Sequence, residues 1–256
     1  MRDIEEIRRV SKIYDDRAQV TDGIKAAGQW GNKELVNEIT QEIIKKMDIK
    51  SEDIILEIGC GSGVLGNVVE ENCKSYYGFD ASKFMLKKFE SEYDTNYTYN
   101  LIQASATEIP FKDEQFDKII MNGVSMYFPN NEFLSQVLNE IIRVAKKKSK
   151  ILIGENIIPS KYCWELVWFE NLSHKKQIFA REYIKIRRWL ARKNSKLAGK
   201  WKTAHQDISP KFVKEFFKNC EEFSSSDAAA YTVRKRKGGE KIKGNRRIDF
   251  IIKLNK

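Results

Sequence analysis

The segment from Asp53 to Asp80 constrains the fold of this chain most. Residues 54–58 form a short apolar run between turn residues, which predicts a buried strand. Three glycines follow within residues 59–63, and without a Cβ they let the backbone turn tightly and approach a ligand. Residues 63–72 are typical of a helix, and residues 76–80 of a second strand that ends in an acid. This order predicts a cradle for a cofactor.

The chemistry of such a cradle is simple. Backbone N–H groups of the turn and of the helix N-terminus offer donors and the positive end of a dipole. Asp80 lies where the second strand ends, so its carboxylate can accept hydrogen bonds from both ribose hydroxyls of an adenosine. The plainer alternative is an ordinary glycine turn with an aspartate on the surface.

Two registers of the glycine turn point to different cofactors. Residues 61–66 match the dinucleotide fingerprint G-x-G-x-x-G, which would make the chain a nicotinamide dehydrogenase. Residues 57–63 instead resemble the first motif of the class I S-adenosylmethionine (SAM)-dependent methyltransferases. In that family an acid two residues before the first glycine helps to hold the methionine end, whereas a pyrophosphate gains nothing from a carboxylate at Glu57.

Further segments resemble the same family over roughly residues 35–155. Residues 103–111 resemble the exit of its third strand, where the adenine is met, and residues 116–122 its fourth strand. Residues 14–18 resemble the tyrosine-containing entry of small-molecule methyltransferases, whose N-terminal helices close over the cofactor. Ser105 stands where many relatives carry an acid, so its hydroxyl or the Ala106 N–H would meet the adenine. The resemblance implies this set of cofactor-binding residues: Tyr14, Glu57, Gly59, Cys60, Gly61, Gly63, Asp80, Ala81, Ser105, Ala106 and Asn122.

The remaining pattern predicts an α/β fold: a Rossmann-like, seven-stranded, mostly parallel sheet with a C-terminal antiparallel hairpin, N-terminal helices and a helical cap insertion. Strands are expected at 98–103, 116–121 and 150–155, with helices at 82–92 and 131–146 between them. Asn32 is expected to cap a helix over 33–47, after a helix over 1–16 and a glycine-rich break over 23–31, where Trp30 stands. The hairpin is expected to join residues 227–236 to 247–253.

We expect one SAM-dependent methyltransferase domain over residues 1–256. Its parts would be an N-terminal helical lid (1–50), a SAM-binding core (51–156), a helical cap insertion (157–207), and a last helix with the hairpin (208–256), started by Ser209 and Pro210. The four cysteines are far apart and only two histidines occur, so the sequence predicts neither a metal site nor a disulfide framework.

Charge is divided unevenly along the chain. Residues 1–150 carry 21 Lys and Arg against 25 Asp and Glu, whereas residues 151–256 carry 25 against 11. The second part would cover the substrate side, so its net charge of +14 predicts an anionic substrate. The arginine-containing runs at 187–188, 234–237 and 246–247 could grip phosphate or carboxylate groups. A solvated, lysine-rich surface is the alternative.

Methyl transfer needs a proton acceptor only when the nucleophile is protonated and poorly acidic. His205, Glu155 and Tyr127 are the candidate catalytic residues. His205 precedes the last helix and has a suitable unperturbed pKa, Glu155 ends a strand, and Tyr127 lies in the loop after the fourth strand. His174 is less suited, because Lys175 and Lys176 follow it.

The sequence therefore predicts SAM-dependent methylation of an O or N atom on a small anionic metabolite that is phosphate-, nucleotide- or sugar-linked. Two other functions stay open: an RNA-modifying methyltransferase that uses the basic C-terminal part, and a SAM-binding partner subunit without chemistry of its own. The charged N-terminus and the absence of a long apolar run predict a cytoplasmic protein without a membrane span. The oligomeric state is left open.

Overall fold

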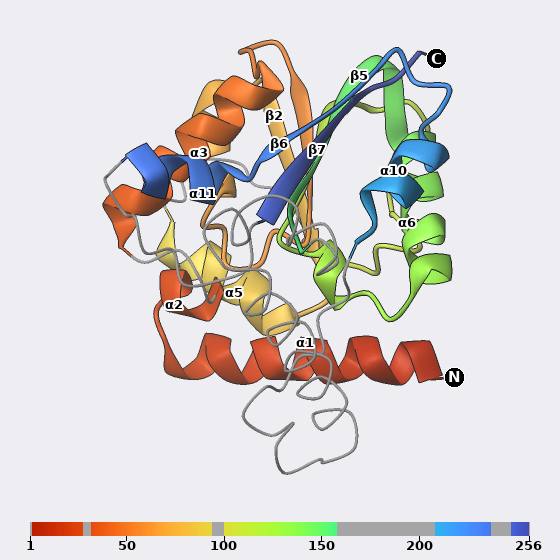
Figure 1. The fold of residues 1–256 in the computed structure, drawn as a ribbon. Coiled ribbons are helices and arrows are strands. Elements are labelled where there is room, and N and C mark those ends of the chain that lie inside the picture. Colours follow the sequence, from red (N-terminus) through yellow and green to blue (C-terminus); the bar gives the residue numbers. More distant parts are fainter. Residues whose placement is uncertain (1, 28–31, 94–99, 158–207, 237–246, 256) are drawn as a thin grey trace, which may run out of the picture.

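The computed structural model describes residues 2–27, 32–93, 100–157, 208–236 and 247–255 (Figure 1). Three helices precede the first strand: α1 (Arg2–Val20), α2 (Gly23–Ala27) and α3 (Lys33–Met47). The strands are β1 (Ile54–Ile58), β2 (Ser75–Asp80), β3 (Asn100–Gln103), β4 (Phe116–Asn122), β5 (Ala145–Ile157), β6 (Glu222–Asp227) and β7 (Arg247–Lys253). The other helical elements are α4 (Gly66–Val69), η1 (Glu70–Asn72), α5 (Lys83–Glu92), η2 (Ser125–Tyr127), α6 (Asn131–Val144), α10 (Pro210–Phe216) and α11 (Ala229–Arg236).

The strands form one seven-stranded sheet in the order β3-β2-β1-β4-β5-β7-β6. Strands β1 to β5 pair in parallel, and β7 runs antiparallel to both β5 and β6. The predicted fold class, with its mostly parallel sheet and antiparallel C-terminal pair, is confirmed.

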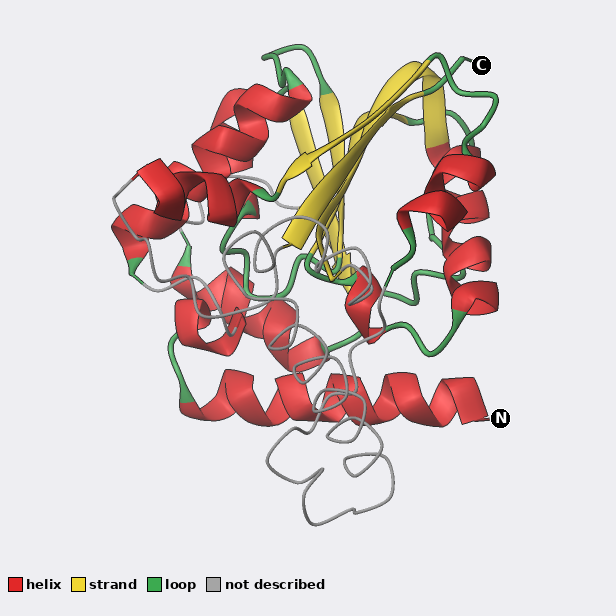
Figure 2. Ribbon diagram, viewed as in Figure 1, coloured by secondary structure: helices red, strands yellow, loops and turns green. Residues whose placement is uncertain are grey.

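Helices cover both faces of the sheet (Figures 1 and 2). One core lies between the sheet and α6 with α10, and it is formed by side chains such as Ile119, Val137 and Val213. The other lies between the sheet and α3, α5 and α11, and it includes Ile43, Phe89 and Val233. Because both faces are buried, the parallel strands read as nearly continuous apolar runs, which is why they were predictable.

The N-terminal helices are tied to the core by polar contacts. The Ser82 hydroxyl donates a hydrogen bond to Asp15 of α1. The Gly23 N–H at the start of α2 donates to the Glu92 carboxylate, at 2.8 Å from Oε2, and the Ser62 hydroxyl donates to the Gly23 carbonyl at 2.7 Å. These contacts hold α1 across one end of the sheet, below the strands in Figure 1. The helix expected over residues 1–16 is confirmed and extends to Val20.

Helix boundaries follow their capping residues. Asn32 caps α3 as predicted, because its side chain accepts a hydrogen bond from the Leu35 N–H at 2.9 Å. Ser82 caps α5 in the same way through the Met85 N–H. Pro210 occupies the first turn of α10, but the Ser209 side chain makes no capping hydrogen bond. The glycine-rich break predicted over residues 23–31 is wrong for residues 23–27, which form α2; Trp30 lies outside the described residues.

Two other predictions are corrected. The helix expected over 63–72 is reduced to the single turn of α4 and the short η1, because the glycine turn extends further than its spacing indicated. The strand expected over 227–236 is wrong, since α11 occupies most of this segment. Three consecutive alanines favour a helix there, and the Asp249 carboxylate accepts the Ala229 N–H at 3.0 Å.

The antiparallel partner that replaces the expected strand beside β7 is β6, a polar edge strand that sequence alone did not reveal. Most of its side chains are exposed, so it has little apolar alternation. Phe223 stacks on Phe250 with ring centroids 5.8 Å apart and anchors the strand. Of the cap insertion predicted over 157–207, Ile157 is the last residue of β5, and residues 158–207 lie outside the described residues. Within the described part of the chain, no helix combines the length and apolar character needed to cross a bilayer.

Candidate active site

The glycine turn after β1 approaches β2 closely. The N–H groups of Gly59 and Cys60 both donate to the Phe79 carbonyl, at 2.8 and 3.1 Å. Gly59 and Gly61 have φ angles of 69° and 54°, in the left-handed region that favours glycine. A Cβ at Gly59 would lie 2.5 Å from a methyl group of Val124, so this position admits no larger residue without rearrangement. The turn thus brings unobstructed backbone to the end of the sheet.

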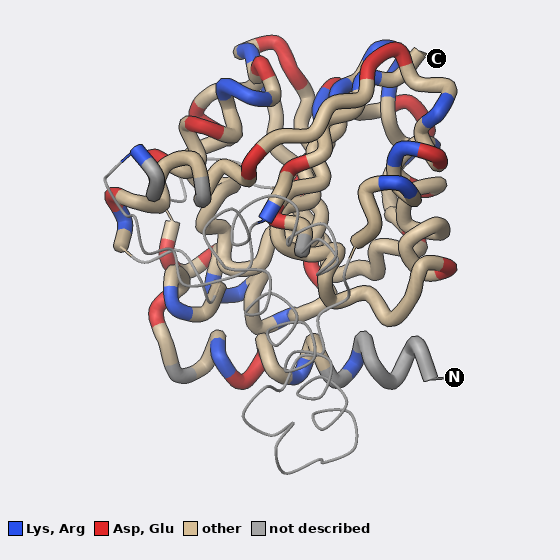
Figure 3. The backbone as a smooth tube through the Cα atoms, in the orientation of Figure 1, with Lys and Arg blue, Asp and Glu red and all other residues tan. Residues whose placement is uncertain are grey.

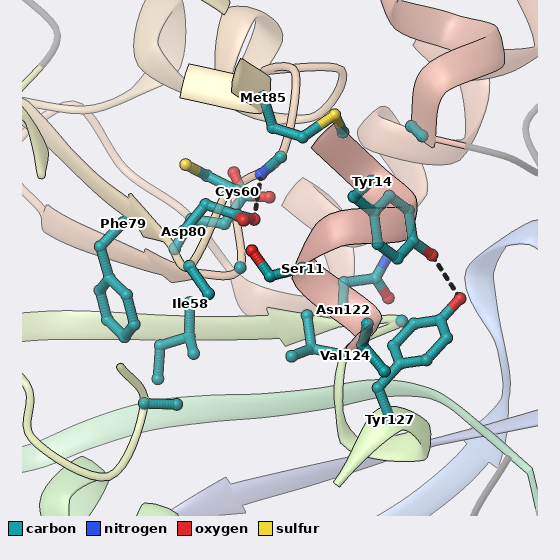
Figure 4. A pocket seen from close by; sticks show the side chains of 18 of the residues that line it. Ser11, Tyr14, Ile58, Cys60, Phe79, Asp80, Met85, Asn122, Val124 and Tyr127 are labelled. Atoms are coloured by element: carbon teal, nitrogen blue, oxygen red, sulfur yellow. Dashed lines mark hydrogen bonds between the residues drawn. The ribbon is translucent and has the colours of Figure 1, made fainter. Parts of the chain in front are cut away.

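Asp80 ends β2 beside this turn, and its carboxylate is held by backbone donors. The Gly61 N–H donates to Oδ2 at 2.9 Å (Figure 4), and the Ser82 N–H donates to Oδ1 at 2.8 Å. Burial raises the pKa of Asp80 to about 6, and these two donors oppose that rise. A carboxylate has about four acceptor positions, so acceptor capacity remains for hydroxyl groups of a ligand.

Glu57 lies on β1, two residues before Gly59 of the glycine turn, and is only 5% exposed. The Tyr76 hydroxyl donates to Glu57 Oε2 at 2.6 Å. Burial raises the pKa of Glu57 to about 8, the Tyr76 hydrogen bond lowers it, and the negative charge of Asp80 raises it. A positively charged ligand group at this position would favour the ionised carboxylate.

A single pocket collects most of the predicted site residues. Ten of the eleven predicted cofactor-binding residues line it, and so do the candidate catalytic residues Glu155 and Tyr127. Gly63 is the exception: it does not line the pocket, and a Cβ added there would lie 2.3 Å from Phe89. The Ser105 hydroxyl lies 2.9 Å from that of Thr107. His205 lies outside the described residues, and the roles of all these side chains stay predictions.

Helix α1 covers the pocket through Tyr14. The Tyr14 hydroxyl donates to the Tyr127 hydroxyl at 2.5 Å, and the two rings meet edge to face with centroids 5.6 Å apart (Figure 4). Burial raises the pKa of Tyr14 above its ordinary value. The contact joins residues 113 positions apart and closes α1 against η2.

The pocket also contains residues that the sequence did not single out. Val10 and Ser11 reach it from α1, and Met85 reaches it from α5. Val10 and Ser11 precede Tyr14 by four and three residues, so helical spacing could have placed all three on one face of α1. Arg247, which the run at 246–247 had indicated as an anion contact, lines the pocket and pairs with Glu155.

We expect ligand binding in this pocket to release protons. The raised pKa values mean that Asp80 and Glu57 stabilise the fold most below about pH 4, and that this contribution is lost as the pH rises through about 6 and then about 8. The ammonium group of S-adenosylhomocysteine lowers the pKa of Glu57 when it binds there, so the affinity should rise between pH 6 and 8, by up to about tenfold per pH unit for the proton released.

Calorimetric titration in buffers of different ionisation enthalpy measures that proton release. Glu57→Gln should remove the part of the pH dependence near pH 8. The expectation is contradicted if the affinity is flat over this range, or if Glu57→Gln leaves its slope unchanged.

The residues fit SAM as cofactor. The pocket has bare backbone at the glycine turn, carboxylates at Glu57 and Asp80, and apolar side chains such as Ile58 and Val124. Glu57 would hold the methionine ammonium group, Asp80 the ribose hydroxyls, and the segment at Ser105 and Ala106 the adenine. SAM supplies a methyl group carried on a positively charged sulfur.

Comparisons with known proteins agree with this assignment. Residues 56–153 match the family model described as "Methyltransferase domain". An uncharacterized methyltransferase of Schizosaccharomyces pombe is 31% identical over 127 residues. The match covers 47% of this chain and 46% of the fungal protein, so the chain spans about half the length of that relative.

Solved structures share the fold. Phosphoethanolamine N-methyltransferase 1 of Haemonchus contortus, in complex with phosphoethanolamine and S-adenosylhomocysteine, superposes with a TM-score of 0.68 at 11% identity, over 99% of this chain and 50% of that one. The N-methyltransferase NodS of Bradyrhizobium japonicum, bound to S-adenosylhomocysteine, superposes with a TM-score of 0.61 at 11% identity, over 94% and 97% of the two chains. Residues 56–153 thus match a methyltransferase domain, and the chain shares the fold of these two solved methyltransferases.

Proposed function

We propose that the protein transfers a methyl group from SAM to an O or N atom of a small, anionic metabolite that is phosphate-, nucleotide- or sugar-linked. One observation carries the proposal: Glu57, the glycine turn and Asp80 converge on a single pocket that α1 covers from the opposite side. Such a covered site can align an acceptor with the methyl group and exclude water. The anionic character of the acceptor draws on the basic C-terminal part of the sequence.

The reaction is an in-line displacement. A lone pair on the acceptor O or N forms the new bond to the methyl carbon, while the bond between carbon and sulfur breaks and leaves its electron pair on sulfur. A protonated acceptor also gives up a proton. Among the described residues, Tyr127 and Glu155 are the candidate proton acceptors, because both line the pocket and neither belongs to the predicted cofactor-binding set. His205 remains a candidate from the sequence.

The pocket favours a small acceptor over RNA. Its described lining carries three carboxylates, those of Glu57, Asp80 and Glu155, and one guanidinium, that of Arg247. Along the described backbone, acidic and basic positions are interspersed (Figure 3). A polyanion binds best to a continuous basic surface, so this pattern offers it little.

Titration of the full chain with SAM, with NADH and with RNA tests the proposal. We expect SAM to bind with micromolar affinity, NADH fluorescence to stay unchanged, and RNA retention to be absent at low salt. Transfer of label from methyl-labelled SAM to a fraction of small cell metabolites would then demonstrate the chemistry. Binding of NADH in place of SAM would overturn the proposal, and retention of RNA with a steep salt dependence would favour the alternative acceptor.

Tyr14→Phe tests the cover over the pocket. The variant keeps the ring but removes the hydrogen bond to Tyr127, so α1 should open more readily. We expect S-adenosylhomocysteine to dissociate roughly five- to tenfold faster, which corresponds to a hydrogen bond worth about 1 kcal/mol. Stopped-flow displacement measures the rate. Tyr93→Phe is the matched control, because Tyr93 packs on Phe89 and does not line the pocket; equal rates in all three proteins would contradict the expectation.

A further inference from the structure

Glu155 and Arg247 both line the pocket and form an ion pair there. Arg247 Nη1 lies 3.2 Å from Glu155 Oε2, and their side chains are 22% and 10% exposed. Glu155 lies near the end of β5 and Arg247 begins β7, so the pair stands at the edge of the sheet where both strands meet the pocket. It is partly withdrawn from water but open to a ligand.

A β-bulge delivers Glu155 to this position. Ile153 pairs with Phe250 and Asn156 pairs with Ile248, so Gly154 and Glu155 together stand opposite the single residue Asp249. Glu155 has a φ of 58°, a left-handed conformation that costs a non-glycine residue free energy. A bulge changes the direction of the side chains that follow it, and bulges are frequent beside active sites.

Buried polar side chains hold the bulge in place. Asp249 is fully buried; it accepts the Glu155 N–H at 3.0 Å and pairs with Lys46 at 2.7 Å. Asn156 is fully buried and donates to the Ile248 carbonyl at 3.0 Å, while the Ser125 hydroxyl donates to Asn156 at 2.7 Å. Burying such groups is unfavourable unless they are paired. The fold therefore maintains this conformation at Glu155 through several independent contacts.

The charges in the pocket divide into two groups. Glu57 and Asp80 belong to the cofactor side, next to the glycine turn. Glu155 and Arg247 are the other charged side chains among the described residues that line the pocket, and their signs are opposite. A ligand with only an acid group would pair with Arg247 and stand beside the Glu155 carboxylate. A ligand with only an amine would pair with Glu155 and stand beside the guanidinium. Each would meet a like charge at close range.

We infer that Glu155 and Arg247 form the acceptor subsite, and that it takes a small zwitterion that carries both an ammonium group and a carboxylate or phosphate. The ammonium group binds Glu155 in place of Arg247, and the acid group binds Arg247 in place of Glu155. Neither protein charge is left without an opposite charge. The inference rests on the proposed function for the methyl transfer itself, and it replaces a purely anionic acceptor by one that carries an ammonium group beside its acid group.

Calorimetric titration of the protein saturated with S-adenosylhomocysteine tests the subsite. Three zwitterions are compared with their singly charged halves: glycine with methylamine and acetate, β-alanine with ethylamine and propionate, and phosphoethanolamine with ethanolamine and inorganic phosphate. At least one zwitterion should bind at least about tenfold more tightly than either of its halves, because each half lacks one charged, hydrogen-bonded contact. The inference is overturned if no zwitterion shows this preference.

Variants assign the preference to the pair. Arg247→Gln and Glu155→Gln should each remove it while the affinity for S-adenosylhomocysteine stays within about twofold of the parent, since a change below about 0.4 kcal/mol is small against one hydrogen bond. Lys253→Gln is the matched control: Lys253 lies on the same strand, in an exposed pair with Glu221, and should keep the preference. Persistence of the preference in Arg247→Gln overturns the inference. Failure of the parent to bind S-adenosylhomocysteine would instead overturn the proposed function.

Discussion

Gly63→Ala is expected to lower the free energy of unfolding by about 3 kcal/mol. Gly63 has a φ of 78°, which costs an alanine about 1 kcal/mol. A Cβ at this position would also lie 2.3 Å from Cδ2 of Phe89. Phe89 is fully buried and packs edge to face on Tyr76 and Tyr93, so it cannot move aside without disturbing the core, and such overpacking costs about 2 kcal/mol. Urea-induced unfolding measures the change.

Gly123→Ala separates the two causes. Gly123 has a similar φ of 72°, but the nearest atom to its added Cβ would be 3.9 Å away. We expect it to lose only about 1 kcal/mol. Combining Gly63→Ala with Phe89→Leu should recover part of the larger loss, because the two changes share one contact. Equal losses in the two glycine variants would show that the Phe89 contact does not matter.

Asp80→Ala is expected to weaken SAM binding on the order of 100-fold. The carboxylate has acceptor positions left after its two backbone donors, and charged hydrogen bonds to a ligand contribute about 1.5–3 kcal/mol each. The variant also frees the Gly61 N–H, which removes a contact that shapes the turn. Equilibrium binding of labelled SAM measures the change, and circular dichroism reports whether the fold persists.

Two further variants make the Asp80 result specific. Asp80→Asn keeps the size and an acceptor oxygen but loses the charge, so its affinity should fall between those of the parent and Asp80→Ala. Asp113→Ala removes an exposed carboxylate that pairs with Arg143 at 2.7 Å, and it should leave the affinity unchanged. SAM affinity that does not respond to Asp80→Ala would mean that the carboxylate does not contact the cofactor.

Local sequence determined the cofactor half of this protein. The order of β1, the glycine turn, β2 and Asp80 is contained in 28 consecutive residues, each step set by short-range physics: apolar runs, glycine conformation and helix caps. Because parallel strands end at the same edge of a sheet, residues as distant as Asp80, Asn122 and Glu155 could be expected at one site.

Only the tertiary structure decided the other half. The bulge at Glu155, its pairing with Arg247 and the contact between Tyr14 and Tyr127 join residues about 90 to 110 positions apart, and no local pattern encodes them. β6 is polar and exposed, so its sequence has little strand periodicity, and the pattern wrongly favours a strand in the alanine-rich segment of α11. Periodicity in the sequence indicates which face of a segment is buried against a core. It does not indicate which distant polar side chains come into contact. At this site such contacts determine which charges face an acceptor.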